Sequence, residues 1–154
     1  MVKKYYFDAN ALFKYYRDEA GSLEVRRLVS SAKPIYISSL TWLECQSVLK
    51  KQQRQGKLKP RLVRQVWNRL RDDVSQSVTT LRPFCELPMP DGCFRQAGSI
   101  LLEYAGRFQF SANDALHVAI ASLIPDKPIF VTSDKSLKNV CNNIDLPYLD
   151  PEVT

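Results

Sequence analysis

The chain has 154 residues, of which 45% are apolar and 25% charged, an ordinary composition for a globular protein with its own core. The first apolar run stops at Asp8, and the longest uncharged stretch in the C-terminal half, 115–125, is shorter than a bilayer requires. We therefore expect one cytoplasmic domain over residues 1–154, with no signal peptide and no membrane span.

Apolar strands alternate with amphipathic helices along the whole chain. Strands are predicted at 4–8, 35–37, within 79–87, at 129–133 and at 146–149. Helices are predicted at 9–17, 22–31, 39–55, from Pro60 through Leu70, from Asp91 to Arg107, at 111–123 and near 135–141. This alternation predicts an α/β fold, with a central, mainly parallel sheet and helices on both faces.

The cysteines are few and widely spaced: Cys45, Cys85, Cys93 and Cys141. They form no CxxC pair, and the chain has a single histidine, His117, so a zinc site is not expected. We predict reduced, mostly buried thiols.

The formal net charge of +6 has a local origin. No acidic residue lies between Glu44 and Asp72, within a predicted helical hairpin at about 39–77 that would form a basic arm. A patch of this density suits a polyanion such as RNA, although it also fits a solvated helical face or an acidic protein partner. The cations of this patch are Lys50, Lys51, Arg54, Lys57, Lys59, Arg61, Arg64, Arg69 and Arg71.

Two aspartates follow predicted strands directly. Asp8 comes after Tyr5-Tyr6-Phe7, and Asp134 ends the run 129–134. Each aspartate alone could simply cap the helix that follows it. In a parallel sheet, however, both would lie at the carboxyl edge, where ligands of such sheets bind.

Two further acids lie in apolar surroundings. Glu44 projects from an apolar helical segment, and Asp114 opens the most apolar helix, where it could form a capping box with Ser111. No cation is obviously placed to neutralise the four acids. Clustered carboxylates repel one another, and Mg²⁺ or Mn²⁺ would relieve the repulsion because both ions prefer oxygen ligands. The pattern therefore predicts metal-assisted phosphodiester hydrolysis.

These residues resemble the motifs of PIN-domain ribonucleases, and within them VapC-type toxins of toxin–antitoxin systems. The matching elements follow one another in the same order over 4–150: Asp8-Ala9-Asn10, Thr41-Trp42-Leu43-Glu44, 111–121 and Thr132-Ser133-Asp134. One departure is Asn10, where the family often has a hydroxyl residue. An amide can still bond a carboxylate or a metal-bound water.

The resemblance implies a three-layer α/β/α sandwich and a Mg²⁺- or Mn²⁺-dependent endoribonuclease. It implies a homodimer and a cognate antitoxin as partner. It also implies metal and catalytic roles for Asp8, Glu44, Asp114 and Asp134, and substrate contacts for Asn10, Thr132 and Ser133.

Other interpretations stay open. His117 lies one turn after Asp114 and could assist at a phosphate, but a packed structural role is favoured. Phosphoryl-transfer enzymes of the haloacid-dehalogenase type need a second aspartate where this chain has Asn10. A receiver domain needs adjacent acids in the loop after the first strand and a lysine after a late strand. A non-catalytic RNA- or protein-binding module would use the basic hairpin at 50–71.

Overall fold

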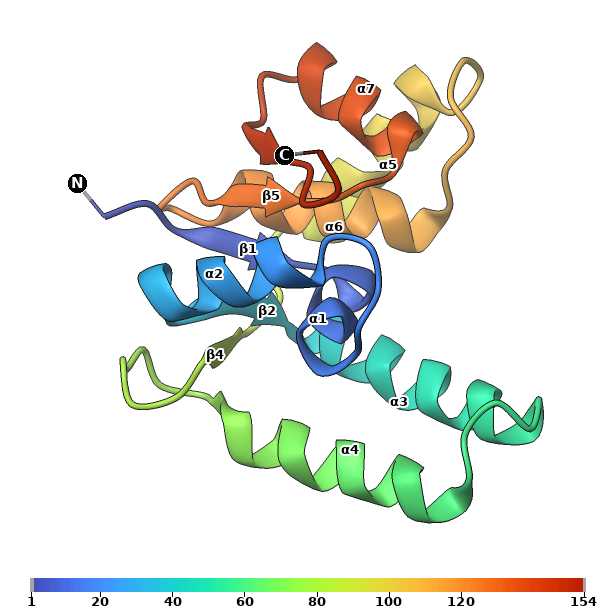
Figure 1. Cartoon of the computed structure of the whole chain (residues 1–154). Coiled ribbons are helices and arrows are strands. Elements are labelled where there is room, and N and C mark those ends of the chain that lie inside the picture. The colour runs from blue at the N-terminus through green and yellow to red at the C-terminus, as the bar shows by residue number, and fades with distance from the viewer. Residues whose placement is uncertain (1, 154) are drawn as a thin grey trace.

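A computed structural model describes residues 2–153 and contains a six-stranded sheet with helices on both sides (Figure 1). Every pair of neighbouring strands is parallel, in the order β3-β4-β2-β1-β5-β6. The strands are β1 (Tyr5–Phe7), β2 (Ile35–Ser38), β3 (Val74–Ser75), β4 (Phe84–Leu87), β5 (Ile129–Val131) and β6 (Tyr148–Leu149). The helices are α1 (Ala9–Tyr16), α2 (Ser22–Ala32), α3 (Ser39–Arg54), α4 (Pro60–Asp73), α5 (Cys93–Tyr104), α6 (Ala112–Leu123) and α7 (Lys135–Asn143).

The alternation of side chains along β1 divides the interior into two cores. Tyr5 and Phe7 face a core shared with α1, α2, α3 and α4, while Tyr6 faces a second core built with α5, α6 and α7. The period of two along a strand sends neighbouring side chains to opposite faces, so both faces of the sheet are covered. The predicted α/β/α sandwich is confirmed.

The predicted elements are confirmed in type and order, with small differences at their ends. Strand β3 was not predicted, because two residues carry no readable alternation. Helix α5 begins at Cys93 with Gly92, not Asp91, as its N-cap, and it ends at Tyr104 rather than Arg107 because Gly106 disfavours helix. Within residues 2–153 no helix has the length and apolar character needed to cross a membrane.

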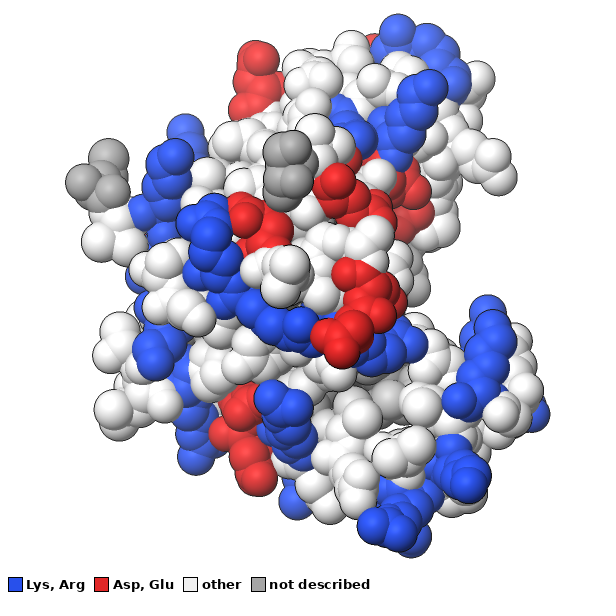
Figure 2. All heavy atoms as spheres, viewed as in Figure 1, with Lys and Arg blue, Asp and Glu red and all other residues white. Residues whose placement is uncertain are grey.

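Helices α3 and α4 form a hairpin that extends away from the sheet (Figure 1). Gly56 permits the turn between them with φ of 72°, and the rings of Trp42 and Trp67 pack with centroids 4.7 Å apart. Tyr16 on α1 donates a hydrogen bond of 2.7 Å to Asp73 and holds the end of α4. Figure 2 shows basic side chains over the free end of this hairpin.

Candidate functional site

Asp8 and Asp134 lie together at the carboxyl edge of the sheet, as the sequence predicted. They follow β1 and β5, which are adjacent and pair Phe7 with Val131. Each also caps the next helix: Asp8 accepts the Ala11 N–H at 2.9 Å, and Asp134 accepts the Leu137 N–H at 2.9 Å. Both predictions for these aspartates are therefore correct: each caps a helix, and both lie at the carboxyl edge of the sheet.

Asp114 and Glu44 reach the same region from helices. Asp114 forms the expected capping box, accepting the Ser111 N–H at 2.9 Å while the Ser111 hydroxyl accepts the Asp114 N–H at 3.1 Å. Glu44 lies in α3, which begins directly after β2 with Ser38 as its N-cap. Both helix openings therefore face the rim that carries Asp8 and Asp134.

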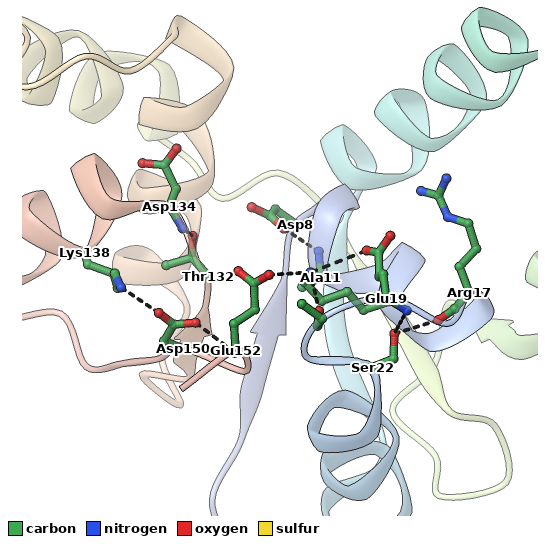
Figure 3. A network of polar contacts seen from close by, with 12 residues as sticks. Asp8, Ala11, Arg17, Glu19, Ser22, Thr132, Asp134, Lys138, Asp150 and Glu152 are labelled. Atoms are coloured by element: carbon green, nitrogen blue, oxygen red, sulfur yellow. Dashed lines mark hydrogen bonds and ion pairs between the residues drawn. The ribbon is translucent and has the colours of Figure 1, made fainter. Parts of the chain in front are cut away.

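Two adjoining cavities bring the four acids together. The first, of about 300 Å³, is lined by Asp8, Asp114 and Asp134 among others, and the second, of about 480 Å³, by Asp8, Asp114 and Glu44. Figure 2 shows acidic side chains around the hollow beside the hairpin, and Figure 3 is a close view that includes Asp8 and Asp134 on their two segments. Because Asp8 and Asp114 border both cavities, the two spaces adjoin and are together called the recess, with Asp134 on one side of it and Glu44 on the other.

The three residues expected to contact substrate line the same recess. Asn10 is exposed and borders both cavities, while Thr132 and Ser133 border the first. The Thr132 hydroxyl accepts the Asp134 N–H at 3.2 Å and steadies the turn that presents this aspartate.

Burial and neighbouring charges disfavour the ionised form of Asp8. Burial is the main reason that the pKa of Asp8 is raised, and the charges of Glu44 and Asp114 raise it further. His117 and the Ala11 N–H act in the opposite direction. A cation bound in the recess would restore the ionised carboxylate.

The expectation that no cation approaches the acids was incomplete, because Lys14 borders the first cavity. Its Nζ donates to the Ala20 carbonyl at 2.8 Å and forms ion pairs with Glu19 at 3.4 Å and Glu152 at 3.7 Å. Lys14 follows Asn10 by one helical turn, so the sequence already places the two side chains on the same face of the helix, the face that borders the acids. Its charge is shared with acids outside the cluster.

A family model described as PIN domain matches residues 5–143. The chain belongs to the PIN-domain family. No curated protein matches the chain.

Solved structures extend the likeness to whole chains. FitAcB from Neisseria gonorrhoeae is 15% identical with a TM-score of 0.65, covering 97% of this chain and 99% of that one. VapBC2 from Rickettsia felis, bound to a promoter DNA fragment, is 16% identical with a TM-score of 0.64, covering 94% and 96%. A toxin–antitoxin complex from Klebsiella pneumoniae is 15% identical with a TM-score of 0.60, covering 96% and 98%. At these identities the likeness establishes the PIN fold alone.

The donor set of this PIN domain fits a hard divalent cation in kind. Every candidate ligand is a carboxylate, and Mg²⁺ and Mn²⁺ prefer such oxygen ligands. Among residues 2–153, however, no three acidic, histidine or cysteine side chains stand close enough to form a finished metal cluster. An ion would therefore have to draw the carboxylates inward.

One predicted side chain has more partners than expected. His117 is buried, as the packed structural role required, with 2% of its surface exposed. Its Nδ1 lies 2.7 Å from the Tyr6 hydroxyl, and its Nε2 forms a hydrogen bond with Glu44 Oε1. Sequence reasoning missed both contacts, although the spacing of one turn from Asp114 placed His117 near the acids.

Proposed function

We propose that this PIN domain is a Mg²⁺- or Mn²⁺-dependent endoribonuclease that hydrolyses RNA phosphodiester bonds, the toxin of a type II toxin–antitoxin pair. The observation that carries the proposal is that Asp8, Glu44, Asp114 and Asp134 line two adjoining cavities, of which Asp8 and Asp114 border both. The raised pKa of Asp8, caused first by burial, adds that this recess favours a bound cation. Membership in the PIN-domain family supports the same activity.

In this proposal the four acids hold the ion, and the helix caps keep Asp8, Asp114 and Asp134 at the cavity walls, from which a bound ion would draw their free oxygens inward. A bound ion would lower the pKa of a water molecule and stabilise charge on the leaving oxygen. Asn10, Thr132 and Ser133 line the space that a phosphate would occupy. The basic hairpin supplies long-range attraction for the RNA backbone.

The partners of the proposed toxin are a cognate antitoxin and a second copy of the chain. A structural neighbour named as a toxin–antitoxin complex supports the first partner. The exposed apolar side chains of Phe94 and Leu102 on α5 are compatible with the second. Light scattering of the purified protein tests the homodimer, and co-purification with the product of the adjacent reading frame tests the antitoxin.

The deciding experiment is cleavage of total RNA by purified protein with Mn²⁺. Wild type should cut, while chelator and Asp8→Ala should each abolish cutting. Glu103→Ala is the matched control, because Glu103 is an exposed acid on α5 that borders neither cavity of the recess. Cutting that survives both chelator and Asp8→Ala would contradict the proposal. RNA binding without cutting would favour a non-catalytic module that uses the basic hairpin.

A further inference from the structure

The single histidine of the chain connects the acidic recess to a buried polar network. His117 lies in α6, and its ring nitrogens contact Tyr6 of β1 on one side and Glu44 of α3 on the other. The residues of these contacts are 111 and 73 positions apart in the chain. The ring therefore joins a strand and two helices at the wall of the second cavity, beside Asp8, Glu44 and Asp114.

The Tyr6 hydroxyl is a partner that can set which nitrogen of the His117 ring carries the hydrogen. Burial is the main cause that raises the pKa of Tyr6, although hydrogen bonds from Ser38 and Thr41 oppose it, so the phenol stays protonated. When the Tyr6 hydroxyl donates to Nδ1 at 2.7 Å, a neutral ring carries its hydrogen on Nε2. A doubly protonated ring also carries a hydrogen on Nε2, so Nε2 donates to Glu44 both in that form and in the neutral form that accepts from Tyr6.

The Tyr6 hydroxyl is itself held in place. Ser38 Oγ lies 2.9 Å from it, and Ser38 and Thr41 form the capping box of α3. The Thr41 hydroxyl donates to the Phe7 carbonyl at 3.1 Å, one residue before Asp8. The network thus ties the start of α3 to the strand that presents Asp8.

Glu44 does not need this arrangement for solvation. A quarter of its side chain is exposed, at 25%, so its carboxylate could turn to water at little cost. Instead it accepts a hydrogen bond from a ring that is 2% exposed. A donor held this rigidly fixes the direction of the carboxylate, as partners of metal ligands commonly do.

We propose that His117, fixed by Tyr6, is a positioning residue that orients the Glu44 carboxylate toward the acidic recess and so raises the affinity for a divalent cation. This inference rests on the proposed metal-dependent function. His117 acts through Glu44 and touches neither the RNA nor the ion. Removing one partner of such a ligand commonly weakens metal binding by about 10-fold or more.

Tyr6→Phe is the sharpest test, because it deletes one oxygen atom and keeps the ring in its core. Tyr36→Phe is the matched control: Tyr36 pairs with Tyr6 across the strands, is buried in the same core, and donates at 2.6 Å to Asp126, which borders neither cavity of the recess. Calorimetry with Mn²⁺ alone should show about 10-fold weaker binding in Tyr6→Phe and wild-type binding in Tyr36→Phe.

Nitrogen NMR of the histidine ring gives a second readout that does not depend on activity. Because the chain has one histidine, its two ring nitrogens are assigned without ambiguity. Wild type should show a hydrogen on Nε2, and Tyr6→Phe should show a mixture of forms. His117→Gln, whose amide can donate to Glu44, should bind Mn²⁺ more tightly than His117→Leu.

The outcomes separate this inference from the nuclease assignment. If wild type binds Mn²⁺ without cutting RNA and Tyr6→Phe binds more weakly, the positioning role stands and the nuclease falls. If wild type cuts RNA but Tyr6→Phe matches it in Mn²⁺ affinity and histidine spectrum, the positioning role is wrong. Absence of Mn²⁺ binding by wild type would overturn both, and equal loss in Tyr36→Phe would reduce Tyr6 to a packing role.

Discussion

Asp8 directly follows strand β1 and Asp134 comes three residues after the end of the adjacent strand β5, and each caps the following helix through its Oδ1 atom at 2.9 Å. The second oxygen of each carboxylate makes no hydrogen bond to any residue between 2 and 153. One carboxylate can therefore serve the fold and remain available to a ligand. Substitutions can separate the two roles, because asparagine keeps the cap and removes the charge.

Asp8→Asn should stabilise the metal-free protein. The pKa of Asp8 is raised in the folded state, chiefly by burial, so the folded state binds the proton more tightly than the unfolded state. The free energy of unfolding therefore decreases as the pH rises from the pKa of Asp8 in the unfolded state to its pKa in the folded state. At neutral pH the folded protein still carries this loss of stability. Urea unfolding at pH 7 with chelator should show a higher free energy of unfolding for Asp8→Asn than for wild type. A lower value would contradict the desolvation argument.

Asp134 should show the capping role most clearly, because its side chain is exposed at the start of α7. Asp134→Ala should lower the free energy of unfolding by about 1 kcal/mol, since an unsatisfied N–H remains. Asp134→Asn should keep most of that stability and still lose RNA cleavage. Thermal unfolding and the cleavage assay on the same preparations check both parts. Equal stability of Asp134→Ala and Asp134→Asn would show that the helix cap does not contribute to stability.

The basic hairpin should contribute to RNA affinity through charge. Changing Lys57, Lys59 and Arg61 to glutamine, in a cleavage-deficient Asp8→Ala background, should weaken binding of a single-stranded oligonucleotide. The slope of log affinity against log salt should drop by about 2, since each lost phosphate contact contributes about 0.7. Fluorescence anisotropy at several salt concentrations measures it.

The control for the hairpin changes the same number of exposed cations elsewhere. Lys3, Lys33 and Arg95 lie outside the hairpin and are exposed. Their replacement by glutamine gives the same net charge as the hairpin variant. If the slope of log affinity against log salt decreases equally in both variants, the attraction comes from net charge and the hairpin has no special role.

The four cysteines should resist alkylation in the folded protein. All four are free in the structure and buried, which confirms the predicted burial. Burial raises the pKa of Cys85, and it raises the pKa of Cys141 to about 12, so these thiols stay protonated near pH 8. Mass spectrometry after iodoacetamide treatment should show no label natively and four labels in guanidinium. Rapid native labelling at any cysteine would show that the core opens.

The strand ends and helix starts of this protein could be predicted because they depend on neighbouring residues. An apolar run that stops at Asp8 marks a strand end, and Ser111 with Asp114 marks a helix start, since caps join groups only three residues apart. From strand ends, the rule that parallel strands share a carboxyl edge led to the acidic recess. The same rule could not give distances within it.

Tertiary packing alone decided the surroundings of the acids. The sequence predicts that Tyr6 lies in a buried strand. Its hydroxyl reaches His117, 111 residues away, only because the strands take the order β2-β1-β5 and α6 packs against the sheet. The pairing of His117 with Glu44, and of Lys14 with Glu152, has no local signature. Secondary structure follows from contacts a few residues apart, whereas these pairs depend on how finished elements pack, and packing is a property of the whole chain.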